Sequence, residues 1–155
     1  TLIKGHKNIL VLKTLSKTVG LRNVRGGFAL ASKELIHTLE DWRLPFEVSN
    51  TSQEVGSIIL GDITHWEKMK RTILNERTWL INKIGSTKDI ELIPTTTTIF
   101  LMRHKNKNLF NMLLNQKILA ADFNNCEGIE NLGFIRISTQ DRANNERLID
   151  ALSRI

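Results

Sequence analysis

A lysine, two hydroxyl residues and an arginine lie close together near the start of the chain. Lys17 follows Thr14 and Ser16, and Arg25 stands just before a pair of glycines. A lysine that is partly desolvated has a lowered pKa, and its amine becomes a nucleophile towards aldehydes. Hydroxyls donate hydrogen bonds to phosphate, and the planar guanidinium of arginine suits the same anion. This set predicts a site for pyridoxal phosphate, an aldehyde with a phosphate; the alternative is a polar turn with solvated cations.

A second arginine, Arg136, lies far away in the run F-I-R-I-S at 134–138. In a strand, Phe134, Arg136 and Ser138 would share one face and the two isoleucines the other. An arginine among apolar neighbours needs an anion if it is buried. The run therefore predicts an anion-binding residue, and the alternative is an exposed arginine on an edge strand.

The elements that must position these residues alternate between short strands and helices. Two early strands with no helix between them cannot complete a doubly wound parallel sheet, so they are expected to be the end of a larger one. The later segments predict a small α+β layer packed as one unit. Apolar and β-branched runs predict strands at 9–13, 27–31, 90–93, 97–102, 118–123 and 133–138, and helical spacing predicts helices at 32–42, 50–60, 63–84, 106–116 and 140–153.

Some helix boundaries carry their own signals. Ser32 is expected to be the N-cap of the first long helix, and Gly85 to end the helix at 63–84. That helix carries apolar residues at helical spacing, which predicts that the stripe packs on a core. The stripe consists of Ile63, Trp66, Ile73, Leu80 and Ile84.

The composition of the chain limits the class of protein to which it can belong. The chain has 155 residues, 41% of them hydrophobic and 25% charged, which suits one globular unit with a real core. The net charge is +6, but the cations are dispersed and do not alternate with aromatic residues, which argues against nucleic-acid binding. The single cysteine, Cys126, suits a reducing, cytoplasmic setting, and no apolar run is long enough for a membrane span. The four histidines lack metal-ligand spacing, so no metal site is expected.

The segment T-L-S-K-T-V-G-L-R-N-V-R-G-G-F, starting at Thr14, resembles the cofactor-lysine segment of fold-type I pyridoxal-phosphate enzymes. The similarity is closest to the histidinol-phosphate aminotransferase and threonine-phosphate decarboxylase group. It continues through L-P-F-E-V-S-N, F-I-R-I-S and N-N-E-R-L-I-D-A-L, in order, over nearly the whole chain. The resemblance implies an α/β fold, the C-terminal half of such an enzyme. Residues 1–62 would end the large cofactor-binding domain, and 63–155 would form a connecting long helix and a small C-terminal α+β domain.

The resemblance also implies roles for single residues. Lys17 would form the Schiff base with the cofactor aldehyde. Thr14, Ser16 and Arg25 would bind the cofactor phosphate, and Arg136 would bind the substrate α-carboxylate. The remaining cofactor groups of this family lie upstream of the matching segment, so the chain is expected to be a fragment that is inactive without the missing N-terminal half.

The activity implied by the resemblance is that of an aminotransferase acting on an amino acid or a derivative of one. The alternative is a decarboxylase of the threonine-phosphate type, because both reactions use the same residues. The intact protein is expected to be a homodimer. Two alternatives of other classes remain: a basic nucleic-acid-binding domain, and a non-catalytic interaction module derived from half an enzyme.

One position departs from the family pattern. The strand before F-I-R-I-S usually carries an arginine for the substrate's phosphate, whereas this chain has Ala121 at about that place, with Asp122 beside it. Alanine cannot bind phosphate, and a neighbouring carboxylate repels one. Either Arg22, Arg103 or an upstream residue replaces the missing cation, or the substrate is not a phosphate ester.

Overall fold

The structure is a computed structural model that describes residues 2–17 and 22–155. The chain divides into two compact units, residues 1–70 and 71–155, which are described separately. The division falls inside one long helix, α4 (Ile63–Gly85), which ends at the glycine expected to end it. The predicted enzyme domains, 1–62 and 63–155, stay a prediction.

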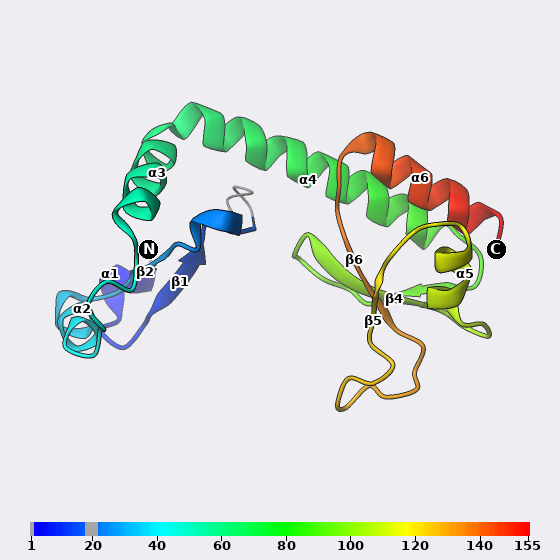
Figure 1. Cartoon of the computed structure of the whole chain (residues 1–155), viewed down its shortest axis with the longest axis horizontal. Helices are drawn as coiled ribbons and strands as arrows, with labels where there is room; N and C mark the ends of the chain where they lie inside the picture. Colours follow the sequence, from blue (N-terminus) through cyan, green and yellow to red (C-terminus); the bar gives the residue numbers. More distant parts are fainter. Residues whose placement is uncertain (1, 18–21) are drawn as a thin grey trace. The chain divides into compact units, whose positions relative to one another are not determined.

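The first unit is built around a two-stranded antiparallel ribbon. Its strands pair from Val11 opposite Leu30 to Thr14 opposite Gly27. The later helices begin at serine N-caps: the Ser32 hydroxyl accepts from the backbone N–H of Leu35 at 3.3 Å, which confirms the predicted cap. In chain order the elements are α1 (Leu2–Gly5), β1 (Val11–Thr14), the 3-10 helix η1 (Arg22–Val24), β2 (Gly27–Leu30), α2 (Lys33–Glu40) and α3 (Asn50–Gly61) (Figure 1).

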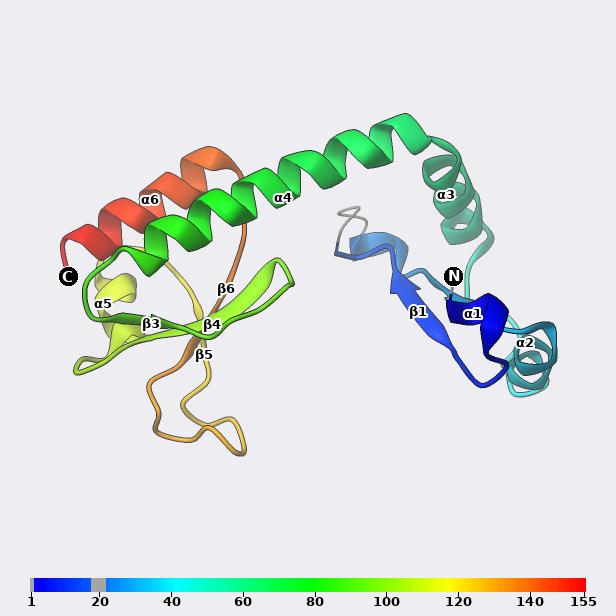
Figure 2. The same ribbon diagram turned by 180° about the vertical axis from the view of Figure 1, so that it is seen from behind.

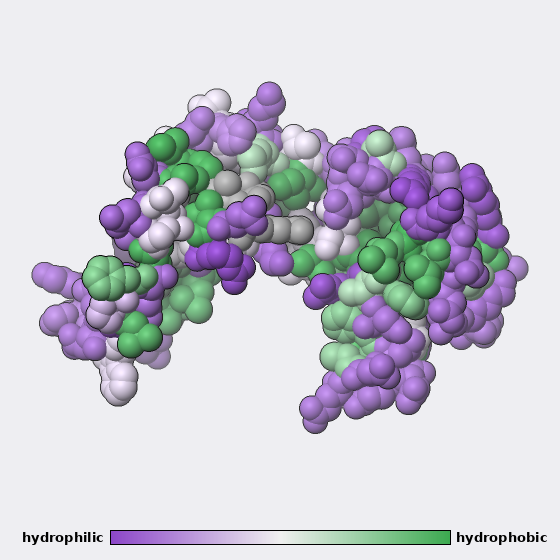
Figure 3. Space-filling view, viewed as in Figure 1, coloured by the Kyte–Doolittle hydropathy of each residue, from purple (hydrophilic) through white to green (hydrophobic). Residues whose placement is uncertain are grey.

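This unit has little core of its own. Leu15 is its one fully buried hydrophobic residue among those described, and Leu12, on β1, is 73% exposed. Figure 3 shows hydrophobic side chains at the surface over β1 and α3. A ribbon of two strands is at best marginally stable alone. The unit therefore depends on the packing of α3, whose Gly56 lies against Leu15.

The second unit is a four-stranded antiparallel sheet with the strand order β3-β4-β6-β5. Phe100 and Met102 of β4 and the two isoleucines of β6 form one core with α5, α6 and the last turns of α4. Helix α6 runs alongside α4 in both views (Figures 1 and 2). The elements are β3 (Ile90–Leu92), β4 (Ile99–His104), α5 (Leu109–Asn115), β5 (Ala121–Asp122), β6 (Ile135–Ser138) and α6 (Arg142–Ser153).

Two sequence expectations need correction here. The strand predicted at 118–123 pairs with β6 only at Ala121 and Asp122; the backbone N–H of Ile118 instead donates to the carbonyl of Leu113 at 2.9 Å. The apolar stripe of α4 is buried only towards its C-terminal end, where Leu80 and Ile84 are 0% exposed, whereas Ile63 is 68% exposed. A helix of 23 residues extends roughly 35 Å, further than four adjacent strands can cover. Periodicity indicates which face is apolar, but not how far along the helix a partner reaches.

A buried polar network ties α6 to α4. The side-chain amide of Asn145, 1% exposed, donates to Glu76 Oε2 at 3.1 Å and to the carbonyl of Gln140 at 2.9 Å. Its carbonyl accepts from the backbone N–H of Gln140 at 3.0 Å. Arg142 donates to both oxygens of Glu76 and lies over the ring of Trp79, 4.2 Å from its centroid. All the side-chain donors and acceptors of Asn145 therefore have partners close to the end of β6.

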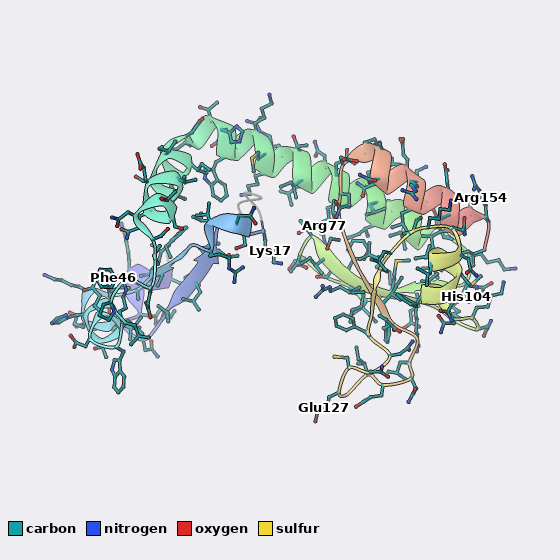
Figure 4. The ribbon with its side chains drawn as sticks, viewed as in Figure 1. Lys17, Phe46, Arg77, His104, Glu127 and Arg154 are labelled. Atoms are coloured by element: carbon teal, nitrogen blue, oxygen red, sulfur yellow. The ribbon has the colours of Figure 1, made fainter. Side chains whose placement is uncertain are left out.

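Arg77, which follows Glu76 on α4, holds the segment that precedes β4. Arg77 donates from Nε to the carbonyl of Thr97 at 2.7 Å and from Nη2 to the carbonyl of Thr95. Figure 4 shows Arg77 reaching from α4 towards the connection that precedes β4. The backbone N–H of Thr139 in turn donates to the carbonyl of Thr98 at 2.8 Å. The chain segments before β4 and after β6, which flank the strand of Arg136, are thus fixed to one helix.

We expect Asn145→Ala to lower the free energy of unfolding of the second unit by about 1–3 kcal/mol, because it removes the three hydrogen bonds of a side chain that is 1% exposed. Urea unfolding followed by tryptophan fluorescence measures this. The matched control is Asn144→Ala, whose side-chain amide bonds only the exposed Asp141, at 3.2 Å. Equal effects of the two substitutions would contradict the role given to Asn145.

The pKa of Glu76 lies below its ordinary value of 4.5, chiefly because Arg142 donates to it; partial burial opposes this shift and Asn145 adds to it. A carboxylate with a lowered folded-state pKa contributes stability that is complete above its unfolded-state pKa and is lost as pH falls through the folded-state one. We therefore expect urea midpoints to fall less between about pH 5 and pH 3 in Glu76→Gln than in the unsubstituted chain. Indistinguishable pH profiles would refute this contribution.

Candidate functional site

The structure brings Thr14, Ser16 and Arg25 together at one end of the β1–β2 ribbon. Thr14 pairs with Gly27, and the backbone N–H of Leu15 donates to the carbonyl of Gly26 at 3.1 Å. Residues 14–16 therefore run beside residues 25–27. The hydroxyl oxygen of Thr14 accepts from the backbone N–H of Ser16 at 3.1 Å, which leaves the Thr14 O–H proton available to donate.

The turn that carries Arg25 has a constrained backbone. Arg25 has a φ of 52°, in the left-handed region, and its side chain is exposed. A Cβ added at Gly27 would lie 2.7 Å from the carbonyl oxygen of Lys13, so the two strands approach too closely for a side chain there. Ser52 of α3 donates to the carbonyl of Val24 at 2.6 Å, which fixes the start of this turn to a helix.

Lys17 follows directly and is exposed (Figure 4). The expected desolvation of its amine is therefore not provided by the described part of this chain. Residues 18–21 of the motif lie outside the described residues. Within the described ranges, 2–17 and 22–155, neither Lys17 nor Arg25 makes an ion pair with a carboxylate. The end of the ribbon thus presents an amine, a guanidinium and two hydroxyls, a set that can hold a phosphate and offer a nucleophile.

Arg136 lies in the other unit, at the centre of β6. Its strand runs between β4 and β5, so it is an interior strand and not the edge strand of the alternative interpretation. The predicted alternation is confirmed: Ile135 and Ile137 are buried and Arg136 is exposed. Its Cζ lies 5.4 Å from the centroid of the Phe123 ring. Because Arg136 is exposed, an anionic partner is not needed for burial, and its guanidinium stays accessible to a ligand.

The neighbours of Arg136 on its own face are mostly apolar. Ala121 on β5 and Leu101 on β4 stand directly opposite it. Among the residues that the structure describes, no carboxylate forms an ion pair with Arg136. Asp122 pairs with Ile135 and so belongs to the opposite face of β5. The repulsion expected from Asp122 therefore does not act on the face of Arg136.

Arg103, one of the candidates to replace the missing cation, is already paired. Its Nε and its Nη2 both lie 2.7 Å from Glu91 Oε2, and its Nη1 donates to the carbonyl of Leu132 at 3.2 Å. Its Cζ also lies 4.8 Å from the centroid of the Phe134 ring. The side chain of Arg22, the other candidate, lies outside the described part of the structure.

Sequence reasoning missed Phe123, Glu91 and the Glu76–Asn145 network. Glu91 and Arg103 stand opposite each other in a hairpin, but the predicted strand at 97–102 stops one residue short of Arg103, so the pair lay outside the prediction. The contact of Arg136 with Phe123 could not be found either, because β5 is too short to show a pattern.

The remaining polar candidates have structural explanations. His104 is buried, and its Nδ1 accepts from the backbone N–H of Asn106 at 3.1 Å, in line with a capping role. Cys126 is a free, exposed thiol. No helix among the described residues is both long and apolar enough to cross a membrane.

Comparison with known proteins gives consistent matches. The family model "Aminotransferase class I and II" matches residues 1–152. The chain is 30% identical to a histidinol-phosphate aminotransferase of Clostridium kluyveri over 154 residues, 99% of this chain and 43% of the relative. Histidinol-phosphate aminotransferase 2 of Archaeoglobus fulgidus is also 30% identical, over 99% of this chain and 44% of its own length. The chain thus spans less than half the length of these curated relatives.

Solved structures agree on the fold. A histidinol-phosphate aminotransferase from Clostridium acetobutylicum superposes with a TM-score of 0.85 at 20% identity, over 98% of this chain and 47% of that one. The L-threonine-O-3-phosphate decarboxylase from Porphyromonas gingivalis gives a TM-score of 0.74 at 27% identity, over 98% and 48%. These matches confirm the predicted fold class and the predicted family resemblance. The chain belongs to the aminotransferase class I and II family.

Proposed function

We propose that this chain is the C-terminal part of a pyridoxal-phosphate-dependent aminotransferase whose substrate is an amino acid or a derivative of one. The observation that carries the proposal is the pair of cationic sites on the two units: the Thr14–Ser16–Lys17–Arg25 group, and Arg136 with no carboxylate partner in the described structure. Family membership and relatives named histidinol-phosphate aminotransferase support it. One neighbouring structure, from Sinorhizobium meliloti, is a complex with pyridoxal-5'-phosphate.

The residues at the ribbon end suit this cofactor. Thr14 and Ser16 supply hydroxyl donors and Arg25 a guanidinium, which together match a phosphate. Gly27 keeps the two strands close, so the backbone positions of the three donors lie at one end of the ribbon. Lys17 supplies the amine that would hold the cofactor covalently, as a Schiff base.

When bound, pyridoxal phosphate supplies an electron sink that labilises the bonds at the substrate Cα. Arg136 would hold the substrate carboxylate and so decide which Cα bond is activated. Lys17, once its amine is free, would act as the general base that moves the Cα proton. The desolvation that the described chain does not provide would have to come from the missing N-terminal part.

The finer properties of the intact protein follow as proposals. It would be a homodimer, since the connection between α2 and α3 exposes Trp42 by 83%, Leu44 by 69% and Phe46 by 98%, an apolar surface that a second subunit could cover (Figure 4). It would act in the cytoplasm, in keeping with its free cysteine. The 155-residue chain by itself is expected to show no amine transfer, because it spans only 43% of the length of its Clostridium kluyveri relative.

A decarboxylase is the second candidate function, favoured by the 27% identity to the threonine-phosphate decarboxylase structure. The visible residues would serve both reactions: Arg136 would then orient the carboxylate for loss as carbon dioxide. An assay of the intact enzyme distinguishes the two reactions. A decarboxylase releases carbon dioxide, whereas an aminotransferase forms a keto acid from the amino donor.

The test is borohydride reduction of the purified chain with pyridoxal phosphate, followed by intact mass and peptide mapping. We expect one adduct, on Lys17, because the adjoining phosphate donors raise the local cofactor concentration at this amine. The adduct should vanish in Lys17→Ala and persist in Lys13→Ala, a matched control for an exposed lysine on the same ribbon.

Adducts scattered over many lysines would show that the chain alone forms no pocket. The same labelling is then done on this chain fused behind the N-terminal part of the Clostridium kluyveri relative. Failure to label Lys17 in that fusion would make the enzyme proposal wrong.

A further inference from the structure

The face of the second unit that carries Arg136 provides a single available cation. Arg136 is exposed on this face and has no carboxylate partner among the residues described. The neighbouring cation is Arg103. It lies on β4 two residues after Leu101, the partner of Arg136, and so belongs to the same face of the sheet. However, Glu91 Oε2 accepts from Arg103 at 2.7 Å, and the carbonyl of Leu132 accepts from it at 3.2 Å.

The side chains directly opposite Arg136 are apolar. The two residues that stand opposite Arg136, Ala121 and Leu101, carry no charge, and Phe123 covers one side of its guanidinium. An arginine over an aromatic ring keeps its edge free for a planar, bidentate acceptor such as a carboxylate. A ligand bound there would therefore meet one positive charge and, beside it, aliphatic and aromatic side chains.

Other cations near β6 lie towards its opposite face. Lys117 and Arg147 line a cleft of about 430 Å³ that also reaches Arg136. Arg147 belongs to α6, which packs on the face of β6 that carries Ile135 and Ile137, and it donates to the carbonyl of Lys117 at 2.9 Å. Arg147 is thus held beside α6. Lys117 takes part only through its backbone carbonyl, and its side chain lines the same cleft.

We propose that this face selects substrates with one carboxylate and an uncharged, apolar side chain, and that Glu91 sets this preference by keeping Arg103 neutralised. The inference rests on the proposed function, in which Arg136 holds the substrate carboxylate. It adds the class of side chain, because the described cation beside Arg136 on this face, Arg103, is already paired with Glu91. Glu91 acts as a specificity-determining residue through Arg103, and Ala121 does so by contributing no charge.

The experiment uses the 155-residue chain and two ligands that share a carboxylate and a three-carbon spacer. They are 4-phenylbutanoate, which ends in an uncharged ring, and 4-phosphonobutanoate, which ends in an anion. Binding is followed by NMR on the Nε–Hε signal of Arg136, assigned from its loss in Arg136→Lys. We expect the phenyl ligand to shift this signal at lower concentration than the phosphono ligand.

Two substitutions should reverse the preference. Glu91→Gln frees Arg103, and Ala121→Arg adds a cation opposite Arg136. Each should tighten binding of 4-phosphonobutanoate by about fivefold, the value of one partly exposed ion pair, and leave 4-phenylbutanoate nearly unchanged. The matched control is Glu127→Gln, which removes the same charge from an exposed loop without freeing an arginine.

The outcomes separate the two proposals. If neither ligand shifts the Arg136 signal, the role of Arg136 in carboxylate binding fails, and the selectivity fails with it. If both ligands bind equally to the unsubstituted chain, or Glu91→Gln behaves like Glu127→Gln, only the selectivity is overturned. The selectivity is also overturned if the phosphono ligand binds more tightly and Arg147→Gln abolishes that binding, which would locate the phosphono group in the cleft beside α6.

Discussion

The burial of Ile135 and Ile137 is the constraint on which the second unit depends. Because side chains alternate along a strand, placing these two isoleucines in the core forces Arg136 to the opposite face. The pairing of β6 with both β4 and β5 prevents the strand from slipping, since a shift by one residue would bury the arginine and expose the core. The position of the candidate carboxylate-binding group is therefore determined by hydrophobic packing on the other side of the sheet.

The polar network of Glu76, Arg142 and Asn145 complements this packing. Hydrophobic contacts fix the layer of β6, but they tolerate small shifts along the strand direction, whereas hydrogen bonds are directional. With Asn145 satisfied on every side-chain donor and acceptor, the chain that leaves β6 has one well-defined course. In the first unit, the Ser52 hydroxyl ties the turn before β2 to α3, and the two strands approach closely at Gly27.

Local signals in the sequence were sufficient for much of the fold. The Ser32 cap, the end of α4 at Gly85 and the alternation around Arg136 are each decided by a few neighbouring residues. The gathering of Thr14, Ser16 and Arg25 was expected from resemblance, and the strand register explains it. Contacts between distant segments could not be predicted. Glu76 and Asn145 lie 69 residues apart, and no periodicity indicates that they meet.

The left-handed backbone of Arg25 places two requirements on one residue. A non-glycine residue held in that region costs about 1 kcal/mol, and glycine would adopt the conformation without that cost. Glycine, however, has no guanidinium. The turn would thus fold more readily with the residue that cannot bind an anion, so folding and the proposed phosphate binding would compete at this position. A bound phosphate would shift that competition, since its attraction to the guanidinium favours the same strained backbone that the free chain resists.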